Sequence, residues 1–327
     1  ATSWILSNLS RNRGGLYGRL TCEIKLTPFT LKECEDYFKN ENIEMSRYDI
    51  VQSYMVFGGI PYYLSYFKKG MSFEGNADNI LFGKNPRLKD EFNRLFNAIF
   101  SNPEDCKKII RLLAKKHVGF TREEIAKETG LPFGGGLTDT LNALVESDFI
   151  QRYRPYNVSG KVSFYKLIDN FSLFWLKYVE PNTEDINFMT DNMTSNIMRV
   201  WRGVAFEEVC WQHIGQIKRA LGISGVSSSI SAWSVKGNDN KEGVQIDLLI
   251  IRNDNVVNLC EMKFAGDIYS IDKEEDAKIR NRIQTLINTL SPKQSVHLTM
   301  ITTYGVSHTM YGGRVQQQVI LDDLFLS

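Results

Sequence analysis

Two apolar runs in the C-terminal third of the sequence constrain the fold more than any other feature. Residues 246–252 and 256–264 are rich in Ile, Leu and Val, a pattern typical of strands that are covered on both faces. The three residues between them, Asn253, Asp254 and Asn255, favour a tight turn. The two runs are therefore predicted to form a β-hairpin within a larger sheet flanked by helices.

Three charged residues interrupt these apolar runs. Asp247 lies in the first run, whereas Glu261 and Lys263 lie two residues apart in the second and so face the same side of a strand. Across a hairpin closed near residue 254, Asp247 and Glu261 come close to opposite positions. An unpaired carboxylate is costly to bury, so Asp247 is predicted to be ion-paired, metal-bound or at an exposed strand end.

Two carboxylates beside a lysine are suited to metal-assisted hydrolysis of a phosphodiester. Asp247 and Glu261 would bind Mg²⁺ or Mn²⁺, which polarises the phosphate and helps generate hydroxide. Lys263 would position the attacking water or neutralise developing charge. Glu207, in the preceding predicted helix, would add a ligand or a supporting hydrogen bond, and Glu208 is its alternative because helix phase does not separate them.

Two interpretations without catalysis remain for these residues. Asp, Glu and Lys are common residue types, so the pattern also fits a buried ion-pair set on adjacent strands. It also fits a domain that retains a nuclease-type fold but lacks activity.

Composition limits the class of protein. The chain has 327 residues, which predicts two or three domains. Its net charge is +1, so any nucleic-acid surface must be a local patch. Five scattered cysteines without CxxC spacing indicate a reducing, cytoplasmic environment. The sequence contains no apolar run long enough to span a bilayer and no visible signal peptide, so no membrane association is predicted.

Residues 103–168 have the element order of a winged helix. Three predicted helices (103–116, 121–130 and 137–147) precede two strands (149–153 and 163–167) joined by a Pro, Asn and Gly-containing loop. The third helix carries no Arg or Lys, whereas Arg152, Arg154 and Lys161 lie on the wing and are candidate nucleic-acid contacts. The alternative is a winged helix with a structural or protein-docking role.

The remaining patterns complete the predicted organisation. Residues 1–30 suggest a helix, a glycine turn and a strand over 20–26, and residues 31–102 form an aromatic-rich helical region. Residues 169–195 contain an aromatic helix and a polar linker, and residues 196–327 form the last domain. That domain is predicted in the order α-β-β-β-α-β, with helices over 201–221 and 273–290 and strands over 296–302 and 315–321.

The C-terminal motifs resemble those of archaeal-type ATPases of the AAA+/STAND class that carry a DUF234 domain. This resemblance implies a C-terminal domain of restriction-endonuclease-like α/β fold, similar to the PD-(D/E)xK nucleases. The metal-binding acid of that superfamily would fall on Asp247, its Glu-x-Lys on Glu261 and Lys263, and its helix acid on Glu207. The segments that carry the resemblance are Trp201-x-Gly203-x-Ala205-Phe206-Glu207, His213-Ile214, Ala220-Leu221-Gly222-Ile223-Ser224-Gly225-Val226, Gln245-Ile246-Asp247-Leu248-Leu249-Ile250 and Leu259-Cys260-Glu261-Met262-Lys263-Phe264.

The N-terminal segments resemble the end of the ATPase core and its helical lid. They are Ser3-Trp4-Ile5, Gly14-Gly15-Leu16-Tyr17-Gly18-Arg19, Leu26-x-Pro28-Phe29 and Gly58-Gly59-Ile60-Pro61-Tyr62-Tyr63-Leu64. The resemblance implies that Ser3 lies near the sensor region and Arg19 near the nucleotide phosphates. The sequence contains no GxxxxGK[ST] motif and starts without Met in an apolar pattern, so we expect a piece of a longer ATPase that binds ATP only at full length.

The fold expected from these observations is an α+β multidomain protein. It comprises an ATPase-core remnant (1–30), a helical lid (31–102), a winged helix (103–168), an aromatic helix with linker (169–195) and a nuclease-like domain (196–327). The expected function is a Mg²⁺-dependent DNA nuclease regulated by ATP in the full-length protein, which would oligomerise, if it does so, through its ATPase domain. The alternative is a non-catalytic, ATP-controlled DNA-binding or regulatory protein with a degenerate nuclease fold. A third option is a protein-interaction scaffold.

Overall fold

The computed structural model is an α+β protein that separates into two compact units. It describes residues 21–22, 24–157, 162–182, 184–235, 237 and 243–326. Predictions for Ser3, Arg19 and Lys161 lie outside these residues. Unit 1 comprises the described residues of Ala1–Phe29, Val56–Tyr153 and Ser163–Met193, and unit 2 comprises those of Thr30–Met55, Arg154–Val162 and Thr194–Ser327.

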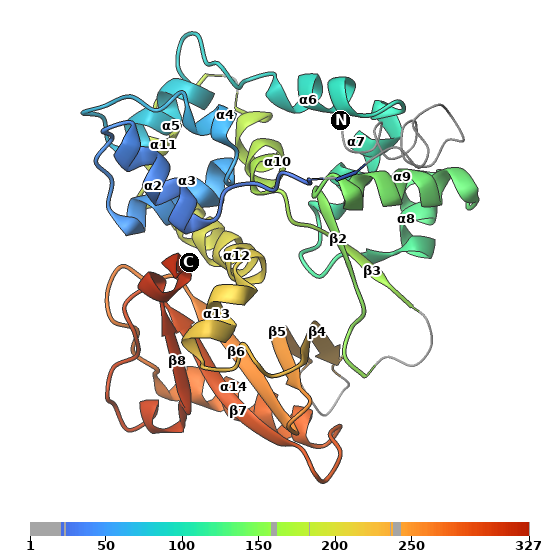
Figure 1. Cartoon of the computed structure of the whole chain (residues 1–327), viewed down its shortest axis with the longest axis vertical. Helices are drawn as coiled ribbons and strands as arrows, with labels where there is room; N and C mark the ends of the chain where they lie inside the picture. The colour runs from blue at the N-terminus through green and yellow to red at the C-terminus, as the bar shows by residue number, and fades with distance from the viewer. Residues whose placement is uncertain are drawn as a thin grey trace. The chain divides into compact units, whose positions relative to one another are not determined.

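One part of unit 1, formed by residues 61–99 and 170–192, is helical and has an aromatic core. The sequence predicts an aromatic-rich helical region over residues 31–102. Phe92 stacks on Trp175 at 4.7 Å between ring centroids, and Tyr63 packs on Phe171 at the same distance. These four aromatic side chains are buried, whereas about half of the surface of Tyr62 is exposed. The helices concerned are α4 (Pro61–Leu64), α5 (Phe73–Leu81), α6 (Glu91–Ile99), α10 (Asn170–Phe174), the π-helical turn η2 (Trp175–Val179) and α11 (Phe188–Asn192) (Figure 1).

The second half of unit 1 contains the three helices and the hairpin predicted over residues 103–168. Thr121 and Glu124 form a capping box at the start of α8. A two-residue strand, absent from the prediction, adds a third member to the sheet, whose order is β1-β3-β2. The elements are α7 (Pro103–Leu113), β1 (Phe120–Thr121), α8 (Arg122–Thr129), α9 (Gly135–Glu146), β2 (Ile150–Tyr153) and β3 (Phe164–Leu167).

The strand predicted over residues 20–26 is not formed in the described part of that segment. A single strand needs a neighbouring strand to pair with. The chain here makes other contacts instead: Lys25 forms an ion pair with Asp148, and the amide of Phe29 donates to the carbonyl of Gly59.

Unit 2 contains a mixed five-stranded sheet with the order β4-β5-β6-β7-β8. Strands β4 to β6 are antiparallel to their neighbours, whereas β6, β7 and β8 run parallel. The crossover from β6 to β7 uses a helix, as parallel neighbours require. The strands are β4 (Ser228–Val235), β5 (Val244–Arg252), β6 (Val256–Lys263), β7 (Ser295–Thr302) and β8 (Gln317–Ile320), so the predicted hairpin and the two later strands are confirmed.

Helices cover both faces of this sheet. Helix α12 (Asn196–Gln212) contacts β5 and β6 and is followed by α13 (Ile214–Ala220). Helix α14 (Lys273–Ile287) contacts β5 and β7 on the other face, where its apolar residues share a core with Leu249, Leu259 and Leu298 (Figure 1). The single helix predicted over 201–221 is wrong, because the helix is interrupted at His213, whose backbone leaves the helical region.

Helix α2 (Leu31–Asn40) and most of α3 (Arg47–Phe57) belong to unit 2, although they lie early in the sequence. The amide of Leu31 donates to Nε2 of His213, and Tyr48 stacks on Phe264 with centroids 4.8 Å apart. The residues expected in one helical lid over 31–102 are thus divided between the two units. The short 3-10 helix η4 (Leu321–Phe325) also contacts α2 and α13.

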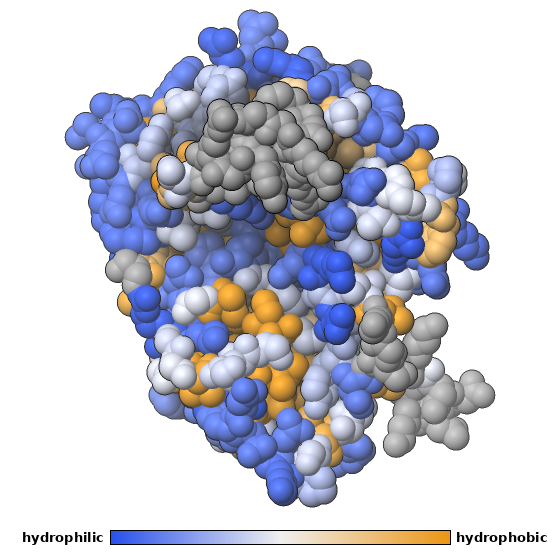
Figure 2. Space-filling view, turned by 45° about the vertical axis from the view of Figure 1, so that its right-hand side comes forward, coloured by the Kyte–Doolittle hydropathy of each residue, from blue (hydrophilic) through white to orange (hydrophobic). Residues whose placement is uncertain are grey.

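The face drawn in Figure 2 is largely hydrophilic, with a group of apolar residues in the lower half of the view. Within the described ranges, no helix combines the length and the apolar character that crossing a membrane requires.

Candidate metal centre

Strand β5 carries Asp247 at an irregular point in the sheet. Ile246 pairs with Trp233 and Leu249 pairs with Ser231 on β4, so two residues of β5, Asp247 and Leu248, lie opposite the single residue Ala232 of β4. This arrangement is a β-bulge, which bends a strand, changes the direction of its side chains and is over-represented next to active sites. Asp247 is only half-buried there, and its Oδ1 accepts a hydrogen bond of 2.6 Å from Gln245.

Helix α12 contributes a second carboxylate to the same place. Oxygens of Glu207 and Asp247 lie within 4.8 Å of each other. One turn further along α12, the indole Nε1 of Trp211 donates to the backbone carbonyl of Asp247 at 2.9 Å, which fixes the helix against the bulged strand. Glu207 is half-buried, whereas Glu208 is completely buried. This geometry favours Glu207 over Glu208 as the helix acid.

Strand β6 presents Glu261 close to Asp247. Leu248 pairs with Cys260, and one further step of the same antiparallel register brings Asp247 opposite Glu261. Nη1 of Arg282, on α14, contacts both carboxylate oxygens of Glu261 at 2.9 Å. Burial raises the pKa of Glu261 to about 7, although the charges of Arg282 and Lys263 lower it and that of Asp247 raises it.

Lys263, two residues further along β6, is also paired with α14. Its Nζ lies 2.8 Å from Oε1 of Glu275. Burial alone would lower the pKa of Lys263, but the interactions with Glu275 outweigh this effect and the net pKa is raised. Lys263 is therefore a cation at neutral pH, able to neutralise negative charge but not to act as a base.

The oxygens of Glu207 and Asp247 fit a hard divalent cation. Metal–oxygen bonds of about 2.0–2.6 Å allow two ligands of one ion to lie up to about 5 Å apart, and the 4.8 Å limit meets this condition. Carboxylates are also the ligand type that Mg²⁺ and Mn²⁺ prefer. Glu261 is the third candidate ligand, but Arg282 occupies its carboxylate in this conformation.

The basic residues expected to contact nucleic acid have separate environments. Arg152, on β2, is exposed, and its Nε donates to Ser163 at 3.3 Å. Arg154 is exposed as well, but its carbonyl accepts a hydrogen bond from Ser231 of β4. The described residues that follow it belong to unit 2, where the amide of Tyr156 donates to the carbonyl of Ala232.

The sequence interpretation missed the contributions of α14 and of Trp211. Glu275 and Arg282 lie seven residues apart, about two helical turns, and so share one face of α14. Their charges are opposite to those of Lys263 and Glu261, which they contact. This complementary spacing was visible in the sequence, but only a structure pairs the helix with the strand. Trp211 follows Glu207 by one helical turn. This spacing was the signal in the sequence that Trp211 lies on the same side of the helix as Glu207.

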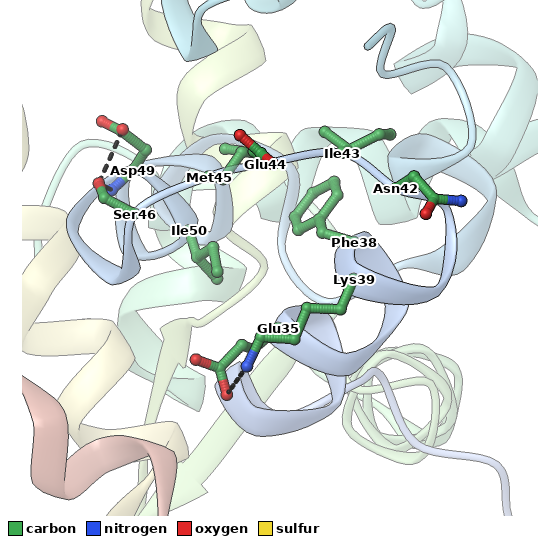
Figure 3. A pocket seen from close by; sticks show the side chains of 10 residues that line it. All are labelled: Glu35, Phe38, Lys39, Asn42, Ile43, Glu44, Met45, Ser46, Asp49 and Ile50. Carbon is green, nitrogen blue, oxygen red and sulfur yellow. Dashed lines mark hydrogen bonds and ion pairs between the residues drawn. The ribbon is translucent and has the colours of Figure 1, made fainter. Parts of the chain in front are cut away.

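A separate cavity of about 540 Å³ lies between α2 and α3. Figure 3 shows Glu35 paired with Lys39, and Ser46 paired with Asp49, at its lining. Glu35 also contacts Lys32 and Arg47, and the hydrogen bond from Arg47 lowers the pKa of Glu35 to about 2. Because three cations already compensate this buried carboxylate, the cavity does not favour a cationic ligand.

Comparison with known proteins gives a relationship but no activity. No family model matches the sequence. The chain is similar to the uncharacterized protein MJECL04 of Methanocaldococcus jannaschii, at 28% identity over 245 residues that cover 73% of this chain and 52% of that protein. The chain thus spans about half the length of this archaeal relative.

Proposed function

We propose that residues 196–327 form a metal-dependent DNA nuclease domain of the PD-(D/E)xK type. The domain would belong to a longer archaeal-type ATPase whose ATP binding regulates it, and residues 103–168 would act as its winged helix. The observation that carries the proposal is the convergence of Glu207 and Asp247, with oxygens within 4.8 Å, beside Glu261 and Lys263. Acids that converge beside basic side chains are suited to metal-assisted phosphodiester hydrolysis.

The chain's own residues have distinct roles in this proposal. Glu207, Asp247 and Glu261 would hold Mg²⁺ or Mn²⁺, which when bound would polarise the phosphate and lower the pKa of water. Lys263, kept protonated by Glu275, would stabilise negative charge that develops on the phosphate. Trp211 would maintain the distance between the helix acid and the strand acid through its hydrogen bond to Asp247.

Cleavage of a labelled DNA in the presence of Mn²⁺ tests the proposal. Asp247→Asn keeps the shape of the side chain but removes its charge, so we expect the cleavage rate to fall by about 100-fold or more. Asp254→Asn is the matched control, because Asp254 lies in the exposed turn of the same hairpin and is paired with the neighbouring Arg252. Metal-dependent cleavage that survives Asp247→Asn would exclude this site.

A second candidate is a non-catalytic, DNA-binding or regulatory protein with a degenerate nuclease fold. The specific observation in its favour is that Glu261 and Lys263 are both ion-paired with α14, as in a structural ion-pair set. This candidate predicts no cleavage with Mg²⁺ or Mn²⁺. It also predicts salt-dependent DNA binding that is unaffected by EDTA and weakened when Arg152 and Arg154 are replaced by Ala.

A further inference from the structure

The contact between Arg282 and Glu261 has an unusual form. Both carboxylate oxygens share one guanidinium nitrogen, Nη1, at 2.9 Å. The strongest Arg–carboxylate pairs use two nitrogens in a fork-to-fork arrangement, and this pair does not. Nε and Nη2 of Arg282 take no part in its contacts with Glu261, so the guanidinium holds the carboxylate in a weaker, more exchangeable geometry.

The position of Arg282 is also that of a charge competing with a metal. Glu261 is 8% exposed, and a buried carboxylate requires a compensating cation. Arg282 supplies that positive charge in the structure. A divalent cation shared with Asp247 and Glu207 would supply it instead, and the guanidinium would then lose its partner.

Arg282 is placed to reach solvent once released. About a quarter of its side chain is exposed, compared with 9% for Glu261. Released guanidinium groups bind phosphate well, since their planar donors match two phosphate oxygens. Lys263, held by Glu275 on the same face of α14, would lie beside it as a second positive charge.

We propose that Arg282 is an exchangeable residue that neutralises Glu261 in the metal-free protein and binds the phosphate backbone of a nucleic acid when a divalent cation replaces it. This inference rests on the proposed function, since it concerns the same metal centre. It makes metal binding and nucleic-acid binding interdependent: each divalent cation bound at Glu261 frees a phosphate-binding group.

Mg²⁺ titration of the whole chain by calorimetry gives the first test. Arg282→Gln removes the competing charge, so we expect it to bind Mg²⁺ about tenfold more tightly than the unsubstituted chain. Arg282→Lys keeps the charge and should stay close to the unsubstituted chain. Lys278→Gln is the control on the same helix, because Lys278 pairs with the exposed Glu274, and it should leave the affinity unchanged.

Binding of a fluorescent single-stranded oligonucleotide with cleavage-resistant phosphorothioate linkages gives the second test. We expect Mg²⁺ to strengthen binding to the unsubstituted chain and to the Lys278→Gln control, and this gain to disappear in Arg282→Gln. Circular dichroism confirms that each variant is folded.

The outcomes separate this inference from the proposed function. If Mg²⁺ binds the unsubstituted chain but Arg282→Gln binds it no more tightly, or keeps the Mg²⁺-dependent gain in oligonucleotide binding, the exchange of Arg282 is refuted while the metal centre stands. If Mg²⁺ binds neither the unsubstituted chain nor Arg282→Gln, the proposed function fails and this inference fails with it.

Discussion

His213 connects two distant parts of unit 2 through both nitrogens of its ring. Nδ1 lies 2.8 Å from the carbonyl of Val209, and Nε2 accepts a hydrogen bond from the amide of Leu31 at 3.0 Å. A carbonyl can only accept and an amide can only donate, so the ring is neutral with its proton on Nδ1. Burial lowers the pKa of His213 to about 4.

This environment predicts a pH dependence of stability. The unfolded chain, in which the His213 pKa is about 6.5, binds more protons than the folded chain between about pH 6.5 and pH 4. Stability should therefore fall as pH decreases through this window. We expect the His213 contribution to the free energy of unfolding to decrease by about 2 kcal/mol between pH 7 and pH 5.

Urea denaturation at both pH values measures this effect by comparison with His213→Gln. The variant should be less stable at pH 7 but should lose less stability on acidification than the unsubstituted chain. An equal loss in both proteins would show that other groups cause the pH dependence.

Gly59 illustrates a residue required by a close backbone approach. A Cβ atom at Gly59 would lie 1.9 Å from the carbonyl oxygen of Phe29, whose amide donates to the Gly59 carbonyl at 2.7 Å. Gly59→Ala must separate these two backbone segments, so we expect the free energy of unfolding to decrease by about 2 kcal/mol or more.

The control for this substitution is Gly136→Ala in α9. A Cβ atom there meets no atom within 4 Å, so helix propensity should stabilise the protein by about 0.5–1 kcal/mol. Thermal unfolding of both variants measures the difference. A neutral effect of Gly59→Ala would mean that the turn relaxes at no cost.

At the scale of elements, α14 determines the charge state of the strand it covers. Glu275 keeps the pKa of Lys263 raised despite burial, which acts to lower it. Glu275→Gln removes the two largest influences that raise the pKa of Lys263, whereas the effect of burial persists, so we expect this pKa to fall. An NMR titration of the lysine side chain measures it, and Glu274→Gln, an exposed acid one residue earlier on the same helix, should leave it unchanged. If the pKa of Lys263 is unchanged in Glu275→Gln, charges other than Glu275 keep it raised.

The elements themselves were accessible from the sequence because their signals are local. The turn at Asn253–Asn255 and the apolar runs beside it predicted β5, β6 and their antiparallel register. The bulge at Asp247 was not predictable, because it depends on the register with β4, a strand that the sequence interpretation did not locate. The pairing of Arg282 with Glu261 was equally hidden, since it depends on which face of the sheet α14 covers.

At the scale of the whole molecule, sequence order and spatial organisation differ. The sequence suggested one helical region over residues 31–102, but Thr30–Met55 belongs to unit 2, which contains the five-stranded sheet. Composition and periodicity identify helices without identifying the surface they pack on. The contact that reveals the assignment is non-local: Tyr48 of α3 stacks on Phe264, directly after Lys263.

This organisation predicts that α2, α3 and the central strands of unit 2 open together. Tyr48→Ala removes the stack on Phe264 and its approach to Tyr304, at 6.2 Å between centroids, and should cost about 2 kcal/mol. Native-state hydrogen exchange should then show faster exchange in α2, α3, β6 and β7, with α5 and α6 of unit 1 unchanged. Tyr62→Ala, which removes a half-exposed tyrosine of unit 1, is the control and should leave β6 and β7 unaffected. Faster exchange in α2 and α3 without any change in β6 and β7 would mean that these helices open independently of the sheet.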